Sequence, residues 1–192
     1  MTPNTEGRGA QRRAPLTSVE RITEFAGPDL HDLCDAAEAA ILDGGGFGWL
    51  NPPERHVMEA YWRGVLVVPE RDLFVARLDR TVAGSAQLVR PSRYNEAQAT
   101  VGQLTTSFMA PWARGHGLAR MVVLAIEDAA RGAGLRVLNL DVRESQEAAI
   151  KLYESLGYTR WGTNPHYALI DGRWTTGYYY YKDLNGGAPK TP

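Results

Sequence analysis

Alternating stretches of apolar and polar residues predict the order of strands and helices along the chain. A period of two, or a short apolar run of strand length, indicates strands at residues 16–25, 72–78, 81–90, 100–109, 137–142, 158–161 and 174–184. Apolar residues spaced three and four apart indicate helices at 28–42, 52–68, 117–131 and 146–156. The two residues between the second and third strands indicate a hairpin. Strands that alternate with helices in this way are typical of the α/β class.

Two segments between these elements bear on function. Residues 43–49 contain too much glycine for regular structure. Their aromatic residues, Phe47 and Trp49, either form a wall of a substrate pocket or pack into the core between two helices. Residues 162–173, which include Pro165, are predicted to form a loop long enough to reach over a site.

The segment from residue 100 to residue 131 combines a predicted strand, a glycine turn and the start of a predicted helix. Pro111 cannot donate a backbone hydrogen bond, so it ends the pairing of the strand on one side and helps to separate it from its neighbour. At the start of the helix, near Gly117, the first backbone N–H groups have no acceptor within the helix, and the helix dipole adds partial positive charge. Such a turn can bind a phosphate through the main chain. The nucleotide-binding patterns GxxxxGK[ST] and GxGxxG do not occur in the sequence.

The residues of this turn resemble those of a known superfamily. Residues 114–119, Arg-Gly-His-Gly-Leu-Ala, resemble the R/Q-x-x-G-x-G/A motif of the GNAT superfamily of N-acetyltransferases. Residues 140–142, followed by 149–158, are similar to the second conserved block of that superfamily. The resemblance implies an α/β fold with a mixed, splayed central β-sheet and helices on both faces. It also implies that acetyl-coenzyme A (acetyl-CoA) is the acetyl donor, with its pyrophosphate held by the turn.

The resemblance extends to individual coenzyme-binding residues. Backbone N–H groups and two arginines of the turn would bind the pyrophosphate, and the preceding strand would lie along the pantetheine arm. The residues expected at the coenzyme are Ser107, Phe108, Met109, Arg114, Gly115, His116, Gly117, Leu118, Ala119, Arg120 and Gln146. Gln146 stands where the family usually has an asparagine, and it offers the same donor and acceptor on a longer arm. No metal is expected, because the sequence has no cluster of histidine and cysteine residues at ligand spacing.

Two residues of the second block are predicted to carry the chemistry. Tyr153 occupies the position of a tyrosine whose hydroxyl, in the family, lies near the coenzyme sulfur, so it would donate a proton to the departing thiolate. Asp141 would take a proton from the acceptor amine, as the acidic residue of this strand does in related protein N-terminal acetyltransferases. Structural interpretations stay open for both residues: Tyr153 as a core residue of an amphipathic helix, and Asp141 as a solvated charge.

Composition narrows the choice of partners and compartment. The chain has 192 residues, enough for one sizeable core, so residues 16–185 are expected to form one domain between a disordered tail at 1–15 and a frayed tail at 186–192. A net charge of -1 provides no general attraction to nucleic acid or to an anionic membrane. The single cysteine, Cys34, excludes an internal disulfide. Because the sequence also shows no signal peptide and no membrane-length apolar run, the expected location is the cytoplasm.

We therefore expect an N-acetyltransferase that moves an acetyl group from acetyl-CoA to a primary amine by direct attack in a ternary complex. The acceptor is expected to be a small-molecule amine, since the aromatic glycine loop suggests a closed pocket. A protein N-terminus or a lysine side chain is the alternative acceptor. The alternative function is a module that senses acyl-CoA without catalysis. The oligomeric state stays open, with a homodimer among the assemblies considered.

Overall fold

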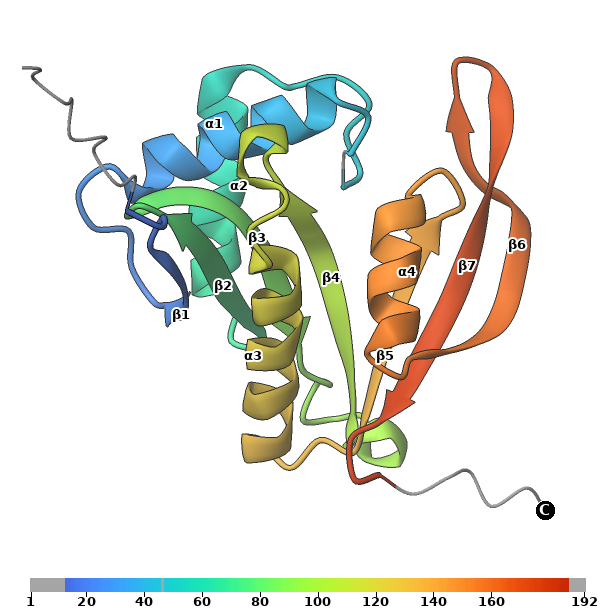
Figure 1. The fold of residues 1–192 in the computed structure, drawn as a ribbon. Helices are drawn as coiled ribbons and strands as arrows, with labels where there is room; N and C mark the ends of the chain where they lie inside the picture. The colour runs from blue at the N-terminus through green and yellow to red at the C-terminus, as the bar shows by residue number, and fades with distance from the viewer. Residues whose placement is uncertain (1–12, 46, 187–192) are drawn as a thin grey trace, which may run out of the picture.

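A sheet of seven strands organises the part of the chain that the structure describes (Figure 1). The structure, a computed structural model, describes residues 13–45 and 47–186, so the predicted tails at 1–15 and 186–192 lie for the most part outside it. The strands are β1 (Thr17–Ile22), β2 (Arg71–Leu78), β3 (Thr81–Val89), β4 (Val101–Met109), β5 (Val137–Arg143), β6 (Thr159–Ile170) and β7 (Arg173–Asp183). Their order across the sheet is β1-β2-β3-β4-β5-β7-β6. The sheet is mixed, as expected, because β4 and β5 pair in parallel whereas the other neighbours are antiparallel.

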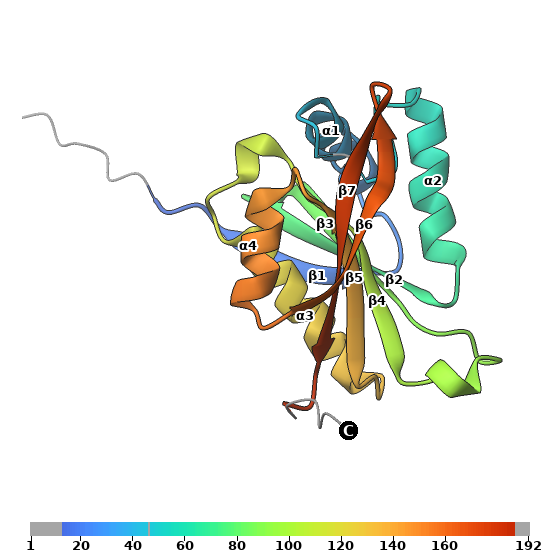
Figure 2. The same ribbon diagram turned by 90° about the vertical axis from the view of Figure 1, so that its right-hand side faces the viewer.

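Helices cover both faces of the sheet, as Figure 2 shows from the side. The helices are α1 (Asp29–Leu42), α2 (Arg55–Val67), α3 (Leu118–Gly132) and α4 (Glu147–Ser155). α1 and α2 bury their apolar stripes on one face, in a cluster that includes Trp62, and α3 and α4 bury theirs on the other, in a cluster that includes Ile126. The predicted α/β fold with helices on both faces is therefore confirmed.

β4 and β5 separate from each other soon after they begin. Their parallel pairs run from Val101–Val137 to Gln103–Asn139, and no later pair joins them in the described chain. Figure 1 shows the two strands diverging, with α4 beside the gap. The sheet is thus splayed, as predicted. Pro111 is not the sole cause, since it comes later, in the short 3-10 turn η2 (Pro111–Ala113).

A β-bulge in β4 contributes to this separation. Opposite β3, the register passes from the pair Gln87–Thr105 to the pair Ser85–Phe108, so three steps along β4 match two along β3. Thr106 lies in this bulge with a φ of 52°, in the left-handed region. Because a bulge bends its strand and increases the local twist, the second half of β4 turns away from β5.

The last strand pair corrects one of the predictions from the sequence. Residues 162–173 do not form a loop, because most of them continue β6, which pairs with β7 and turns through Asp171 and Gly172. Both turn residues have positive φ, 49° and 75°, as a tight two-residue hairpin turn requires. Pro165 hides the strand in the sequence, because proline argues against a central strand. β6 lies at the edge of the sheet, where proline is tolerated. The predicted hairpin between β2 and β3 is confirmed.

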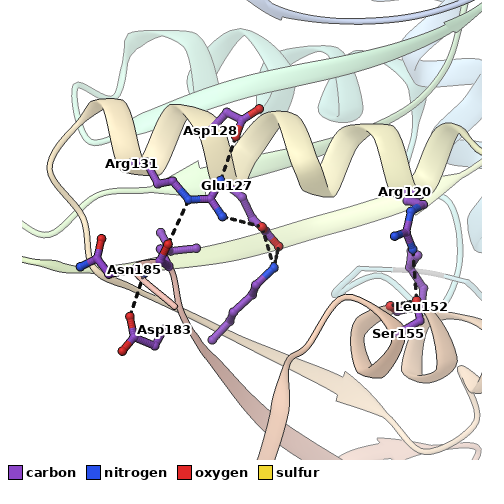
Figure 3. A network of polar contacts seen from close by, with 10 residues as sticks. Arg120, Glu127, Asp128, Arg131, Leu152, Ser155, Asp183 and Asn185 are labelled. Carbon is purple, nitrogen blue, oxygen red and sulfur yellow. Dashed lines mark hydrogen bonds and ion pairs between the residues drawn. The ribbon is translucent and has the colours of Figure 1, made fainter. Parts of the chain in front are cut away.

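A buried carboxylate ties α3 to the end of the sheet (Figure 3). Glu127 is 1% exposed, and both of its oxygens accept a hydrogen bond from Lys182 Nζ of β7 at 2.7 Å. Arg131, one turn further along α3, donates to Glu127 and to the carbonyl oxygen of Leu184. A buried charge is costly unless it is paired, so these contacts fix the position of α3 relative to β7.

Candidate active site

The gap between β4 and β5 opens into two cavities that meet beside α4. We call them the turn cavity, ≈ 610 Å³, lined by β4, the glycine turn before α3 and the start of α4, and the loop cavity, ≈ 450 Å³, lined by the glycine loop after α1 and by β4, β5 and β6. The residues that line both are Gly45, Ser107, Gln146, Ala149 and Tyr153. Two molecules bound in the two cavities would therefore meet at these residues.

The glycine turn has the geometry of an anion site. Gly115 and Gly117 take positive φ values of 83° and 75°, which glycine adopts without the steric cost of a side chain. Gly117 is the N-cap of α3, and the first turn of α3 contains no acidic residue. The N–H groups of residues 118–120 therefore lie at a helix end that carries partial positive charge. All of the predicted coenzyme residues except His116, which is exposed, line the turn cavity.

The two arginines of this turn have side-chain partners on two different elements. Arg114 Nη1 lies 2.6 Å from Asp43 Oδ2, at the start of the glycine loop. Arg120 Nη1 donates to Ser155 Oγ on α4 at 3.3 Å, as Figure 3 shows. Both arginines are exposed and both line the cavity. Each guanidinium has several N–H donors, so each can bind an anion in addition to its present partner.

Tyr153 lies where the two cavities meet. Its side chain is 5% exposed and packs edge-to-face on Tyr158, so the interpretation as a core residue is partly right. Burial raises the pKa of the Tyr153 hydroxyl, a hydrogen bond with the Ser107 side chain opposes this, and the charge of Asp141 adds to the rise. The hydroxyl therefore keeps its proton at neutral pH and is available as a hydrogen-bond donor.

Asp141 faces the loop cavity from β5. Its neighbours Leu140 and Val142 are buried on the side of α3 and α4. Because successive side chains of a strand point to opposite faces, Asp141 points to the side of α1 and α2. It is exposed, and Asp141 and Arg143 are the charged residues among those described as lining this cavity. The hydroxyl of Tyr167 on β6 donates a hydrogen bond to Asp141 Oδ2.

Sequence reasoning missed Tyr167, since it placed residues 162–173 in a loop. The Asp-Gly pair at 171–172 is the signal that could have revealed it, because such a pair between two strand-like segments indicates a hairpin. Burial raises the pKa of the Tyr167 hydroxyl, and the hydrogen bond to Asp141 and the charge of that carboxylate raise it further. Tyr167 is therefore the donor in this pair, and Asp141 is the acceptor.

Phe47 and Trp49 combine the two roles that the sequence left open. Both line the loop cavity. Phe47 also stacks on Phe108 with ring centroids 4.7 Å apart, and Trp49 meets Tyr61 of α2 edge-on at 5.0 Å. The aromatic residues of the glycine loop are thus a cavity wall that is fixed by packing on the core.

Gln146 joins this loop to the start of α4. It is the N-cap residue of α4, and its Nε2 donates to the carbonyl oxygen of Gly44 at 2.9 Å. Because Gln146 lines both cavities, the same side chain borders the two sites and holds the loop between them.

Three further observations concern metal ligands, the single cysteine and the length of the helices. Within residues 13–45 and 47–186, no group of three or more histidine, cysteine or acidic side chains is placed to hold a metal ion. Cys34 is fully buried on α1, and burial raises the pKa of its thiol to about 11. None of the helices in this part of the chain is long and apolar enough to cross a membrane.

Comparison with known sequences gives a consistent result. Residues 35–158 match the model of the acetyltransferase (GNAT) family. The chain is 66% identical over 129 residues to an uncharacterised N-acetyltransferase of Azospirillum brasilense, and the match covers 67% of this chain and 77% of that relative. The family match includes β4, the glycine turn, β5 and α4, which contribute to both cavities, but not β6, which contributes Tyr167 to the loop cavity.

Solved structures share the fold. An N-acetyltransferase of Staphylococcus aureus superposes with a TM-score of 0.74 at 20% identity, over 88% of this chain and 99% of its own. A protein of Salmonella typhimurium, solved with its cofactor acetyl-CoA, superposes with a TM-score of 0.69 at 19% identity, over 91% of this chain and 98% of its own. At such identities the likeness concerns the fold alone.

Proposed function

The chain belongs to the acetyltransferase (GNAT) family and is an acetyl-CoA-dependent acetyltransferase, and from that premise we propose that it transfers the acetyl group directly to the amine of a small molecule. The observation that carries this proposal is the meeting of two cavities at Tyr153. One cavity has an anion-binding turn and the other has a carboxylate, Asp141. The turn suits an anionic acetyl donor, and Asp141, which shares the loop cavity with Arg143, provides a carboxylate for an amine.

In this proposal the turn cavity takes acetyl-CoA. The N–H groups at the start of α3, with Arg114 and Arg120, bind the pyrophosphate through charge-assisted hydrogen bonds. β4 from residue 107 to residue 109 pairs with β3 on one side and borders the cavity on the other, so its backbone can hold the pantetheine arm. A Cβ built at Gly115 or Gly117 would meet open space, so it is the positive φ of these residues that favours glycine in this turn.

The loop cavity takes the amine. An ammonium group must lose a proton before its nitrogen can attack a thioester, and Asp141 is the carboxylate placed to attract it and accept that proton, directly or through one water. Asp141 passes this first proton on to solvent before the attack. As the new C–N bond forms and the C–S bond breaks, the second proton of the amine passes to Asp141 and the electron pair of the C–S bond stays on sulfur.

Tyr153 acts on the departing sulfur. Its hydroxyl, kept protonated by burial, donates a hydrogen bond to the thiolate as charge develops there. A tyrosine with a raised pKa is a much weaker acid than a thiol with a pKa of about 8.5, so stabilisation by hydrogen bonding is favoured over full proton transfer. The thiol then gains its proton from solvent.

Direct transfer is preferred over a covalent acetyl-enzyme. Cys34 is buried in α1 and does not line either cavity. Ser107 does line the junction, but the described lining residues of the two cavities include no histidine that could activate its hydroxyl. The amine itself is therefore the nucleophile.

A small molecule is the preferred acceptor because the loop cavity is bounded on several sides. Trp49 and Phe47 close it on one side and Tyr167 of β6 on another, and its volume lies in the range of small-ligand pockets.

We also place the enzyme in the cytoplasm, since its buried single cysteine suits a reducing compartment, and we take residues 16–185 as one catalytic domain.

The proposal is tested by following free thiol release from acetyl-CoA with matched acceptors. Each pair consists of a free amine, such as an amino acid, and a peptide that begins with the same residue. We expect turnover that depends on the amine and is faster for the free amine. Turnover with the peptides but not with the free amines would show that protein N-termini are the acceptors. Binding of acetyl-CoA without turnover of any amine would favour the alternative function, a module that senses acyl-CoA without catalysis.

A further inference from the structure

We propose that Tyr167 is a positioning residue that fixes the carboxylate of Asp141 for its reaction with the acceptor amine. This inference rests on the proposed role of Asp141 as the base. The hydroxyl of Tyr167 donates to Oδ2 of Asp141, so the carboxylate is held from β6 while it faces the loop cavity. Both residues line the loop cavity.

An irregularity in β6 brings Tyr167 to this position. The register passes from the pair Asn164–Gly177 to the pair Ala168–Thr175, so four steps along β6 match two along β7. The two additional residues bend β6 at Pro165 to Tyr167. Bulges commonly re-aim side chains beside active sites, and this one directs Tyr167 across β7 toward β5.

Gly177 makes room for the ring of Tyr167. A Cβ atom built at Gly177 would overlap the Cβ and ring carbons of Tyr167. The tyrosine side chain therefore lies close against the backbone of β7 at Gly177, and a side chain at position 177 would displace it. From there the ring meets Tyr179, with ring centroids 6.2 Å apart and planes at 75°.

These contacts leave Tyr167 little freedom. Its side chain is half-buried and contacts the backbone of β7 at Gly177 and the ring of Tyr179. Its hydroxyl donates to the carboxylate of Asp141. A hydrogen bond to an ionised partner is stronger than a neutral one, so it fixes the carboxylate as well as the tyrosine. Asp141 itself is exposed on a strand, and this bond from β6 restrains the rotation of its side chain.

The test is a double-mutant cycle of Asp141→Asn and Tyr167→Phe, measured as kcat and KM with two acceptors of different basicity. An alkylamine with a pKa of about 10.4 depends on a base, whereas an α-amine near 8 depends on it less. We expect Tyr167→Phe to lower kcat about tenfold or more for the alkylamine and clearly less for the α-amine. We also expect it to have no further effect once Asp141 is replaced, since the two residues act as one unit.

Two further variants keep the outcome interpretable. Gly177→Ala should reproduce the kinetic effect of Tyr167→Phe by displacing the ring. The matched control is Gly162→Ala on β6, whose added Cβ would lie 3.6 Å from Tyr179, an ordinary contact. Tyr178→Phe is the control for loss of a hydroxyl, because Tyr178 packs against the cluster on the other face. Both controls should keep wild-type kinetics.

Three results would overturn the inference. The first is additive effects of Asp141→Asn and Tyr167→Phe, and the second is an equal loss for both acceptors, as expected if Tyr167 only stabilised the fold. The third is an Asp141→Asn variant with wild-type kcat, which would remove the base and with it the role of Tyr167. Acetyl-CoA affinity and amine-dependent turnover of the wild type test the proposed function separately.

Discussion

The side-chain amide of Gln146 donates a hydrogen bond to the carbonyl oxygen of Gly44, 2.9 Å away, and so connects the start of α4 to the glycine loop. Because this loop carries a wall of the loop cavity, the bond links the shape of the proposed acceptor site to the helix that carries Tyr153. We expect Gln146→Ala to raise KM for the amine about threefold to tenfold, the usual worth of one hydrogen bond. Lys151→Ala, an exposed change on the same helix, is the control, and an unchanged KM in Gln146→Ala would contradict the linkage.

Tyr153→Phe removes the hydroxyl that we place at the departing sulfur while keeping the ring. We expect kcat to fall about a hundredfold, because the hydrogen bond forms as charge develops on sulfur, with little change in the affinity for acetyl-CoA. The control is Tyr158→Phe, whose ring packs on Tyr153 but which is not among the described residues that line the two cavities, so the loss of its hydroxyl should leave kcat unchanged. Calorimetric titration with acetyl-CoA and steady-state kinetics measure the two quantities. A lower affinity at unchanged kcat would assign Tyr153 to binding instead.

Arg114→Gln removes positive charge from the mouth of the turn cavity. We expect the affinity for acetyl-CoA to weaken about tenfold, and less so at high salt, where charge interactions are screened. Since Arg114 also pairs with Asp43, Asp43→Asn serves as the companion variant. If the arginine acts on the coenzyme, Asp43→Asn should keep or improve the affinity. Equal losses of acetyl-CoA affinity in Arg114→Gln and Asp43→Asn would show that Arg114 acts through its ion pair with the glycine loop and not on the coenzyme.

The ion pair of Asp29 and Arg77 predicts a pH dependence of stability. Asp29 is 6% exposed and accepts two hydrogen bonds from Arg77, at 2.7 and 3.0 Å. The hydrogen bonds from Arg77 lower the pKa of Asp29 below its ordinary value of 3.8, although burial opposes this. Because the folded-state pKa is the lower one, the stabilisation is complete above pH 3.8 and is lost as the pH falls through the folded-state value.

Asp29→Asn should therefore lower the free energy of unfolding by about 3 kcal/mol at pH 7 and by less at pH 3, because the stabilisation declines as the pH falls below 3.8. Urea denaturation at the two pH values measures it. The control is Asp128→Asn, whose partner Arg131 lies at the surface and whose own side chain is 79% exposed, so it should cost well under about 1 kcal/mol. If Asp29→Asn lowered the free energy of unfolding by the same amount at both pH values, the stabilisation would not come from the ionised carboxylate of Asp29.

Most of the fold could be predicted because local patterns agree with it. The helices that begin near Pro28 and Gly117 carry clear apolar stripes, and the turn at Gly117 needs the positive φ that its sequence suggests. β6 could not be predicted in full, since its pairing with β7 is non-local and Pro165 interrupts the pattern. Edge position makes that proline acceptable, and the order of strands is not visible in a single sequence.

The candidate site was predictable only as far as its residues share one motif. Tyr153 and Asp141 follow from the resemblance of one continuous block, and both line the expected gap. Tyr167 depends on a bulge in one strand and on Gly177 in another, so its position arises from tertiary packing. The contact of Gln146 with Gly44 joins residues 102 positions apart, and no local pattern reports such a contact.

The measurement that tests the central claim most directly is free thiol release from acetyl-CoA, compared between the wild type and Tyr153→Phe with one good amine acceptor. Cys34 is fully buried, so a thiol reagent should report the released coenzyme with little background from the native protein. We predict release that requires the amine and that falls about a hundredfold in the variant, while both proteins bind acetyl-CoA equally well. Equal release from the two proteins would contradict transfer at the junction of the two cavities.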